Sequence, residues 1–130
     1  MKTAAKFANI FITAVLLLSL CGAMARAEIV SSEGHSYIAS CNDNGFTLTS
    51  EYPTSRFVEA GSASRVIKGT EVFYLGASCD VSNNYFGSGT WCWANGGFFI
   101  DFDKGANIGF SRQELYCPRN DNLGMDCRCR

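Results

Sequence analysis

The chain has 130 residues, of which 47% are hydrophobic and 18% are charged, and its formal net charge is −1. Its length fits a single globular domain. The first 27 residues contain three basic and no acidic side chains, so residues 28–130 carry a net charge of −4. This acidic balance, without a basic cluster, argues against nucleic acid and anionic membrane surfaces as partners, because both require grouped Lys and Arg.

The N-terminal segment has the pattern of a secretory signal peptide. A positively charged start precedes an apolar run over 10–20, and Ala25-Arg26-Ala27 places small residues where a signal peptidase cleaves. The run is shorter than the roughly 20 residues that span a bilayer. We therefore predict a signal peptide over 1–27, cleavage after Ala27, and a periplasmic or secreted protein without membrane insertion. A lipid on Cys21 is the alternative, which the large residue before it disfavours.

Short apolar or alternating runs, separated by Gly, Asn, Asp and Ser, predict strands and turns along the rest of the chain. The predicted strands are 36–41, 46–49, 70–75, 90–94, 98–102, 108–110 and 116–117, with 56–59 ambiguous, a polar loop over 80–89 and a polar tail over 119–130. No segment keeps a helical period. We therefore expect a single all-β domain over 28–130, a small disulfide-stabilised barrel or meander.

The clearest element is a β-hairpin over 90–102 that turns at Asn95-Gly96 or Gly96-Gly97, because a type I′ turn needs positive φ at both central residues. Strand side chains alternate between faces. One face of this hairpin, which we predict as core, carries Trp91, Trp93, Phe98, Ile100 and Phe102, and the other carries Cys92, Phe99 and Asp101. The alternative is that the aromatic face binds a ligand, since large aromatic side chains dominate binding hot spots.

Residues 28–130 contain six cysteines: Cys41, Cys79, Cys92, Cys117, Cys127 and Cys129. An even number of cysteines in a small exported domain predicts a disulfide framework, here of three bonds. A bond between Cys127 and Cys129 would be strained, because only one residue separates them. Zinc binding by Cys117 with these two is the alternative, which the missing CxxC spacing and the oxidising compartment disfavour.

The expected pairing joins Cys79 to Cys92, because they flank the polar loop between two strands that we expect to be neighbours. Cys41 and Cys117 would then each bond to one of Cys127 and Cys129. This arrangement would tether the polar tail to the body of the domain.

The stretch from Val66 to Cys117 resembles a small SH3-type barrel of exported bacterial proteins. The order of its parts carries the resemblance: Ile67-Lys68-Gly69-Thr70 before a strand, a polar loop, a Trp-bearing strand, and Ile108-Gly109-Phe110 before a tight turn. The whole chain resembles small exported bacterial cysteine-containing proteins of unknown function. The resemblance implies an SH3-like barrel and supplies no catalytic residue.

The loop over 80–89 contains the candidate ligand-binding residues, Asn83, Asn84, Tyr85 and Phe86. Long loops in compact domains are usually functional or disordered. Amide groups beside aromatic rings suit a protein or carbohydrate partner. The alternative is that the two aromatic side chains fold back onto the barrel.

His35 is the only histidine and therefore the first candidate for a general base. With Arg112 and Glu114 it would supply the groups of a small secreted hydrolase or ribonuclease, provided that the three side chains converge on one phosphate. Asp101-Phe102-Asp103 with Asn107 lacks most ligands of a calcium loop. We predict no metal and no cofactor.

These observations favour an exported binding or inhibitor-type protein, which acts without catalysis on an envelope component, a polysaccharide or a partner protein. A small secreted hydrolase or ribonuclease is the first alternative, and a structural envelope protein is the second. The sequence leaves the oligomeric state open.

Overall fold

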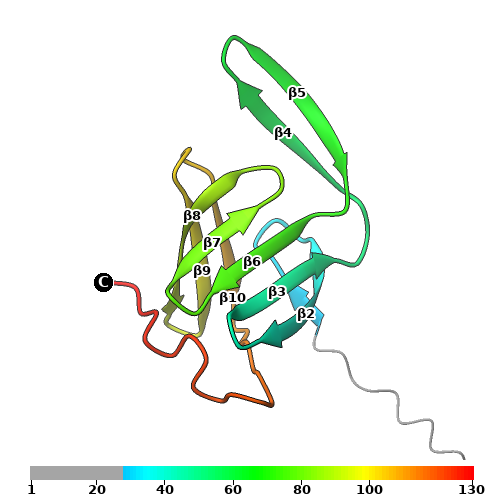
Figure 1. The fold of residues 1–130 in the computed structure, drawn as a ribbon. Coiled ribbons are helices and arrows are strands. Elements are labelled where there is room, and N and C mark those ends of the chain that lie inside the picture. Colours follow the sequence, from blue (N-terminus) through cyan, green and yellow to red (C-terminus); the bar gives the residue numbers. More distant parts are fainter. Residues whose placement is uncertain (1–27) are drawn as a thin grey trace, which may run out of the picture.

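A computed structural model describes residues 28–130, so the predicted signal peptide and Cys21 lie outside the described residues. This part of the chain forms ten strands and no helix (Figure 1). The strands are β1 (Glu28–Val30), β2 (Ser36–Asn42), β3 (Gly45–Ser50), β4 (Thr54–Ala60), β5 (Ala63–Gly69), β6 (Val72–Gly76), β7 (Asp80–Asn83), β8 (Gly87–Ala94), β9 (Gly97–Phe102) and β10 (Asn107–Ser111). Within the same residues, no helix is present that could cross a membrane.

Eight strands form one antiparallel sheet in the order β1-β2-β3-β6-β7-β8-β9-β10. Every strand therefore pairs with its neighbours along the chain, except where β4 and β5 are inserted between β3 and β6. The first and last strands approach each other, because the backbone N–H of Ser32 donates to the carbonyl oxygen of Gly109 at 2.7 Å. The sheet is a nearly closed barrel, which confirms the predicted all-β class. The SH3-like detail is compatible with it and stays a prediction.

The inserted strands β4 and β5 form a separate two-stranded sheet that projects from the barrel (Figure 1). We call this hairpin, Thr54–Gly69, the arm. Its turn contains Gly61 with φ +63°, a conformation that costs glycine little. The sequence left the first half of the arm ambiguous and assigned no strand to its second half.

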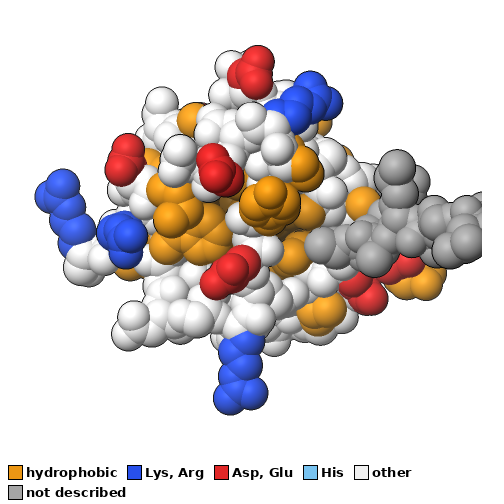
Figure 2. All heavy atoms as spheres, turned by 90° about the horizontal axis from the view of Figure 1, so that it is seen from below, with side chains coloured by type: hydrophobic (Ala, Val, Ile, Leu, Met, Phe, Trp, Pro, Cys, Tyr) orange, Lys and Arg blue, Asp and Glu red, His pale blue; other side chains and the backbone are white. Residues whose placement is uncertain are grey.

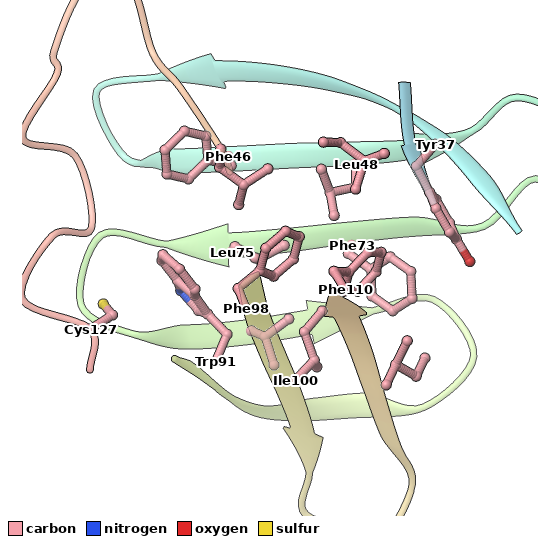
Figure 3. Close-up of a cluster of buried hydrophobic side chains, with 14 of the residues drawn as sticks. Tyr37, Phe46, Leu48, Phe73, Leu75, Trp91, Phe98, Ile100, Phe110 and Cys127 are labelled. Carbon is pink, nitrogen blue, oxygen red and sulfur yellow. The ribbon is translucent and has the colours of Figure 1, made fainter. Parts of the chain in front are cut away.

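The barrel interior is filled by large apolar side chains from every strand of the eight-stranded sheet (Figure 3). The predicted orientation of the side chains of the β8–β9 hairpin is confirmed. On the face predicted as core, Trp91, Phe98, Ile100 and Phe102 are buried and Trp93 is half-buried. On the other face, Phe99 and Asp101 are exposed. Phe98 stacks on Phe110 with ring centroids 4.4 Å apart. The aromatic face is therefore packed as core.

The predicted polar loop over 80–89 is wrong at both ends, because 80–83 belong to β7 and 87–89 belong to β8. Residues Asp80–Asn83 form β7, which pairs with β6 on one side and β8 on the other. Val81 and Asn83 point inward while Ser82 faces solvent. Because one of the two inward residues is a polar asparagine, the sequence lacks the apolar–polar alternation that would have indicated this strand. The real connection between β7 and β8 is only 84–86. The predicted closing strand over 116–117 is also absent from the described residues.

All six cysteines are paired, as Cys41–Cys117, Cys79–Cys127 and Cys92–Cys129. The three predicted bonds are confirmed, and so is the tethering of the tail by its last two cysteines. The proposed pairing is wrong. The carbonyl oxygen of Cys79 accepts from the backbone N–H of Trp91 at 3.0 Å, but Cys92, the next residue of β8, faces the opposite side of the strand from Trp91 and bonds to Cys129. Each bond instead joins the barrel to the C-terminal residues 112–130, which follow β10. Three disulfides indicate an oxidising, extracellular compartment.

The tail, residues 112–130, closes one end of the barrel. Its buried side chains are Leu115, Cys117, Leu123 and Cys127. The backbone N–H of Trp93 donates to the carbonyl oxygen of Cys127 at 2.6 Å, and that of Cys129 donates to the carbonyl oxygen of Trp93 at 3.0 Å. Figure 2 shows this end from below, with hydrophobic side chains gathered at its centre and acidic side chains among them.

The tail also depends on one glycine that lies against the core. Gly124 has φ +69°, and a Cβ there would lie 2.7 Å from the ring of Trp91. We expect Gly124→Ala to lower the free energy of unfolding by about 1–3 kcal/mol more than Gly34→Ala, because the buried ring cannot move away. Gly34 is the matched control, since its φ is +84° and its surroundings are open. Denaturant titration with intact disulfides measures both, and equal losses would contradict the packing of Gly124 on Trp91.

Candidate functional site

A buried ion pair connects the arm to the barrel. Arg56 of β4 lies back against the barrel, where its Nε donates to Oε1 of Glu71 at 3.0 Å and its Nη2 donates to Oε2 at 2.9 Å. The hydroxyl of Tyr37 donates to the same Oε2 at 2.6 Å. Glu71 and Tyr37 are both 0% exposed, and Arg56 is 5% exposed. The arm is therefore held at its base by charged hydrogen bonds away from water.

The remaining polar groups around Glu71 are also satisfied. Asn83 Nδ2 donates to Glu71 Oε1 at 3.3 Å, and the backbone N–H of Glu71 donates to Ser50 Oγ at 2.9 Å. Glu33 forms a second ion pair with Nη1 of Arg56. Among the described residues, no buried side-chain nitrogen or oxygen lacks a hydrogen-bond partner. The cluster is complete without a ligand.

The protonation states in this cluster suit an anchor rather than an acid or base. Burial, followed by the hydrogen bond to Glu71, raises the pKa of Tyr37 above its ordinary value. Burial alone would lower the pKa of Arg56, but the hydrogen bonds to Glu71 and Glu33 outweigh it and raise that pKa. The phenol therefore stays protonated and the guanidinium stays charged near neutral pH. Neither group has a proton to exchange there.

A groove runs between the arm and the end of the barrel. It consists of two hollows of about 280 and 410 Å³ that share Phe57, Phe86 and Ala106 as lining residues. One wall is β4 of the arm, and the other is formed by the β7–β8 turn and the β9–β10 loop. Glu33, His35 and Arg56 line the larger of the two hollows. We call this feature the arm groove.

The structure places both predicted aromatic residues, Tyr85 and Phe86, in the wall of the arm groove. Phe86 is half-buried: its ring lies 5.2 Å from that of Phe102, and the guanidinium of Arg56 lies over it at 5.4 Å. The hydroxyl of Tyr85 donates to the carbonyl oxygen of Thr70 at 3.4 Å. These side chains thus pack on the barrel with one side and line the groove with the other.

The two predicted amide residues hold the turn in shape. Asn83 Oδ1 accepts from the backbone N–H groups of Tyr85 and Phe86 at 2.8 and 3.0 Å. Asn84 Oδ1 accepts from the backbone N–H of Val72 at 2.9 Å, and its Nδ2 donates to the carbonyl oxygen of Thr70 at 3.0 Å. Their hydrogen-bonding groups are therefore engaged within the protein. A ligand in the groove would meet the aromatic residues instead.

The residues of the hydrolase alternative are not brought together. His35 lines the arm groove beside Asn107, the first residue of β10. Arg112 follows the last residue of the same strand, and Glu114 lines a different hollow of about 260 Å³ with Trp93 and Met125. Residues 28–130 also contain no cluster of three or more His, Cys, Asp or Glu side chains that could hold a metal ion.

Sequence reasoning missed the exposed surface of the arm. Phe57 and Val66 are directly opposite each other across β4 and β5, and they are 62% and 67% exposed. The apolar pair Phe57-Val58 ends three residues before Gly61, and the apolar pair Val66-Ile67 begins five residues after it. Apolar or β-branched pairs on both sides of a glycine are the signal that indicates this hairpin.

No protein-family model matches this chain, and no curated protein and no solved structure shows significant similarity to it.

Proposed function

We propose that this protein is an exported binding protein, periplasmic or secreted after cleavage behind Ala27, which recognises a partner protein through the arm and the arm groove without catalysis. The observation that carries the proposal is the exposed apolar pair Phe57 and Val66. Both residues lie on the arm, whose two strands pair only with each other and not with the barrel sheet. Exposed apolar side chains that lie together on a soluble protein mark interaction surfaces.

The architecture of the arm favours a protein partner. β4 and β5 pair only with each other, so each strand has one unpaired edge that offers backbone N–H and C=O groups. An extended segment of a partner can add to such an edge, with side-chain pockets for specificity. A projecting hairpin also fits the cleft of a hydrolase, which is the inhibitor-type interaction expected from the sequence.

The anchor supports the same proposal energetically. An isolated two-stranded hairpin is at best marginally stable in water. The ion pair of Arg56 and Glu71 holds the base of the arm in one position before any partner arrives. A recognition element that is already ordered loses less conformational entropy on binding.

The test is capture of a partner by the purified protein, 28–130, from envelope and medium extracts, followed by affinity measurement with the purified partner. We expect Phe57→Ser/Val66→Ser to weaken binding by roughly thirtyfold or more, because one hot-spot residue contributes about 2 kcal/mol. Tyr116→Ser is the matched control, since Tyr116 is 72% exposed and lies on the tail. Its affinity should equal that of the unchanged protein.

Equal affinity of the arm variant and the unchanged protein would contradict the proposal. So would turnover of RNA or a polysaccharide that His35→Ala abolishes, since this result would favour the enzyme alternative. Phe57→Ser/Val66→Ser and Tyr116→Ser remove exposed side chains, so the thermal stability of these two variants should stay close to that of the unchanged protein.

A further inference from the structure

The outer face of the barrel carries a row of hydroxyl side chains that crosses five strands. Residues directly opposite one another in successive strand pairs form this row: Ser40 in β2, Thr47 in β3, Tyr74 in β6, Ser82 in β7 and Ser88 in β8. Thr47 is half-buried and the other four are exposed. Because neighbouring strands lie about 4.8 Å apart, successive hydroxyl-bearing residues of the row are spaced by about this distance.

A hollow of about 200 Å³ lies beside the middle of this row. Its floor contains Gly45 and Gly76, which are directly opposite each other and present only backbone on the outer face. Gly45 requires glycine, because a Cβ there would lie 2.0 Å from the backbone carbonyl oxygen of Leu75. A Cβ on Gly76 would lie 2.1 Å from Asp80 Oδ1, so the Asp80 side chain would have to move. The hollow is therefore built into the strand pairing.

The rim of the hollow combines one aromatic ring with uncharged polar groups and one carboxylate. Its polar and aromatic lining residues are Thr47, Tyr74 and Ser82 from the row, together with Asn42, Asn44 and Asp80. Tyr74 is 54% exposed. The Oδ1 of Asn42 accepts from the backbone N–H of Asn44 at 2.8 Å, which holds that side chain in place before a ligand binds.

We propose that this hollow binds one unit of a neutral, extended polysaccharide whose chain continues along the hydroxyl row. The ring of Tyr74 offers an apolar face to the C–H face of a sugar, while hydroxyl and amide groups pair with the sugar hydroxyls. Over β3, β6 and β7, the three strands whose row residues border the hollow, the row passes directly from one strand to the next, which favours an extended, β-linked chain. Beyond these strands the row curves away with the nearly closed sheet. The hollow is also smaller than the roughly 300–1,000 Å³ of sites for whole small molecules, which suits a single unit of a polymer.

The charge of the hollow selects against anionic polymers. Its lining contains Asp80 and no Lys or Arg. The net charge of residues 28–130 is −4, which adds to this repulsion. A neutral sugar instead offers hydroxyl donors to the carboxylate of Asp80. This site lies on the side of the barrel and involves no residue of the arm, so it goes beyond the proposed protein-binding function.

The experiment is co-sedimentation of the purified protein, 28–130, with insoluble cellulose and with chitin, both neutral β-linked polysaccharides. We expect saturable binding to at least one of them, and a loss of about tenfold or more in affinity for Tyr74→Ala. Tyr116→Ala is the matched control, because it removes another exposed tyrosine, 72% exposed, from the tail. The control should bind like the unchanged protein.

Absence of sedimentation with both polysaccharides, or an equal effect of the two tyrosine variants, would overturn the proposal. Binding that a soluble anionic polysaccharide displaces as well as soluble neutral oligosaccharides do would overturn the argument from charge. Phe57→Ser/Val66→Ser should sediment like the unchanged protein. The polysaccharide site and the protein-binding arm are thus tested separately.

Discussion

Replacing Trp91 with alanine is expected to lower the free energy of unfolding by about 3–5 kcal/mol, the usual cost of removing a large buried aromatic side chain. Trp91 is 1% exposed, and its ring contacts those of Phe46, Trp93 and Phe98 edge to face. Its Nε1 donates to the carbonyl oxygen of Gly76 at 2.9 Å. This one side chain therefore connects β3, β6 and β9 inside the barrel (Figure 3).

Denaturant titration of the oxidised protein measures this loss. Phe99→Ala is the matched control, because Phe99 belongs to the paired strand and points outward. Trp93→Ala should fall between the two, since Trp93 is half-buried and its Nε1 donates to the carbonyl oxygen of Gly124 at 2.9 Å. A Trp91→Ala variant as stable as the control would contradict the core assignment.

Replacing Glu71 with alanine is expected to cost about 3–5 kcal/mol, because the guanidinium of Arg56 would remain buried without its main counter-charge. Tyr37 would lose its acceptor at the same time. The effect should extend beyond global stability. Backbone amides shared by β4 and β5 should exchange hydrogen faster, since the arm loses its anchor.

The control for this second prediction removes the whole cluster. Replacing a buried ion pair by apolar residues of similar volume is often neutral or stabilising. Glu71→Leu/Arg56→Met/Tyr37→Phe should therefore recover most of the stability lost in the single variant. A loss below about 1 kcal/mol for Glu71→Ala, or a triple variant no more stable than the single one, would show that the ion pair does not hold the arm.

Stability and binding are expected to separate in this protein. Trp91 and Glu71 lie in the interior, whereas Phe57, Val66 and Tyr74 are exposed. Substitutions at the exposed positions should change recognition with little effect on unfolding, because they remove few buried contacts. A folded variant that has lost a partner is the result that would assign a function to either surface.

The candidate site was predicted only in part. Tyr85 and Phe86, which the sequence singled out as candidate ligand-binding residues, lie in one wall of the arm groove, and their role in binding stays a prediction. The opposite wall of that groove comes from β4, about 28 positions earlier in the chain, counted from Phe57 to Tyr85. No local pattern connects two such segments, because their contact depends on how the arm leaves the barrel.

The sequence by itself determined the features that depend on near neighbours in the chain. Alternation along 90–102 assigned Trp91, Phe98 and Ile100 to the core, because successive strand residues face opposite sides. The number of cysteines predicted three disulfides, and the spacing of Cys127 and Cys129 excluded their mutual bond.

Only the tertiary structure decided the features that depend on distant parts of the chain. The disulfides join cysteines that are 76, 48 and 37 positions apart, and none of them is the bond between Cys79 and Cys92 that the sequence predicted. Glu71 gives no sequence sign of burial, yet Arg56 balances its charge and Tyr37 donates a hydrogen bond to it. The physical reason is that strand register and burial are set by the closure of the whole sheet, which short-range patterns do not contain.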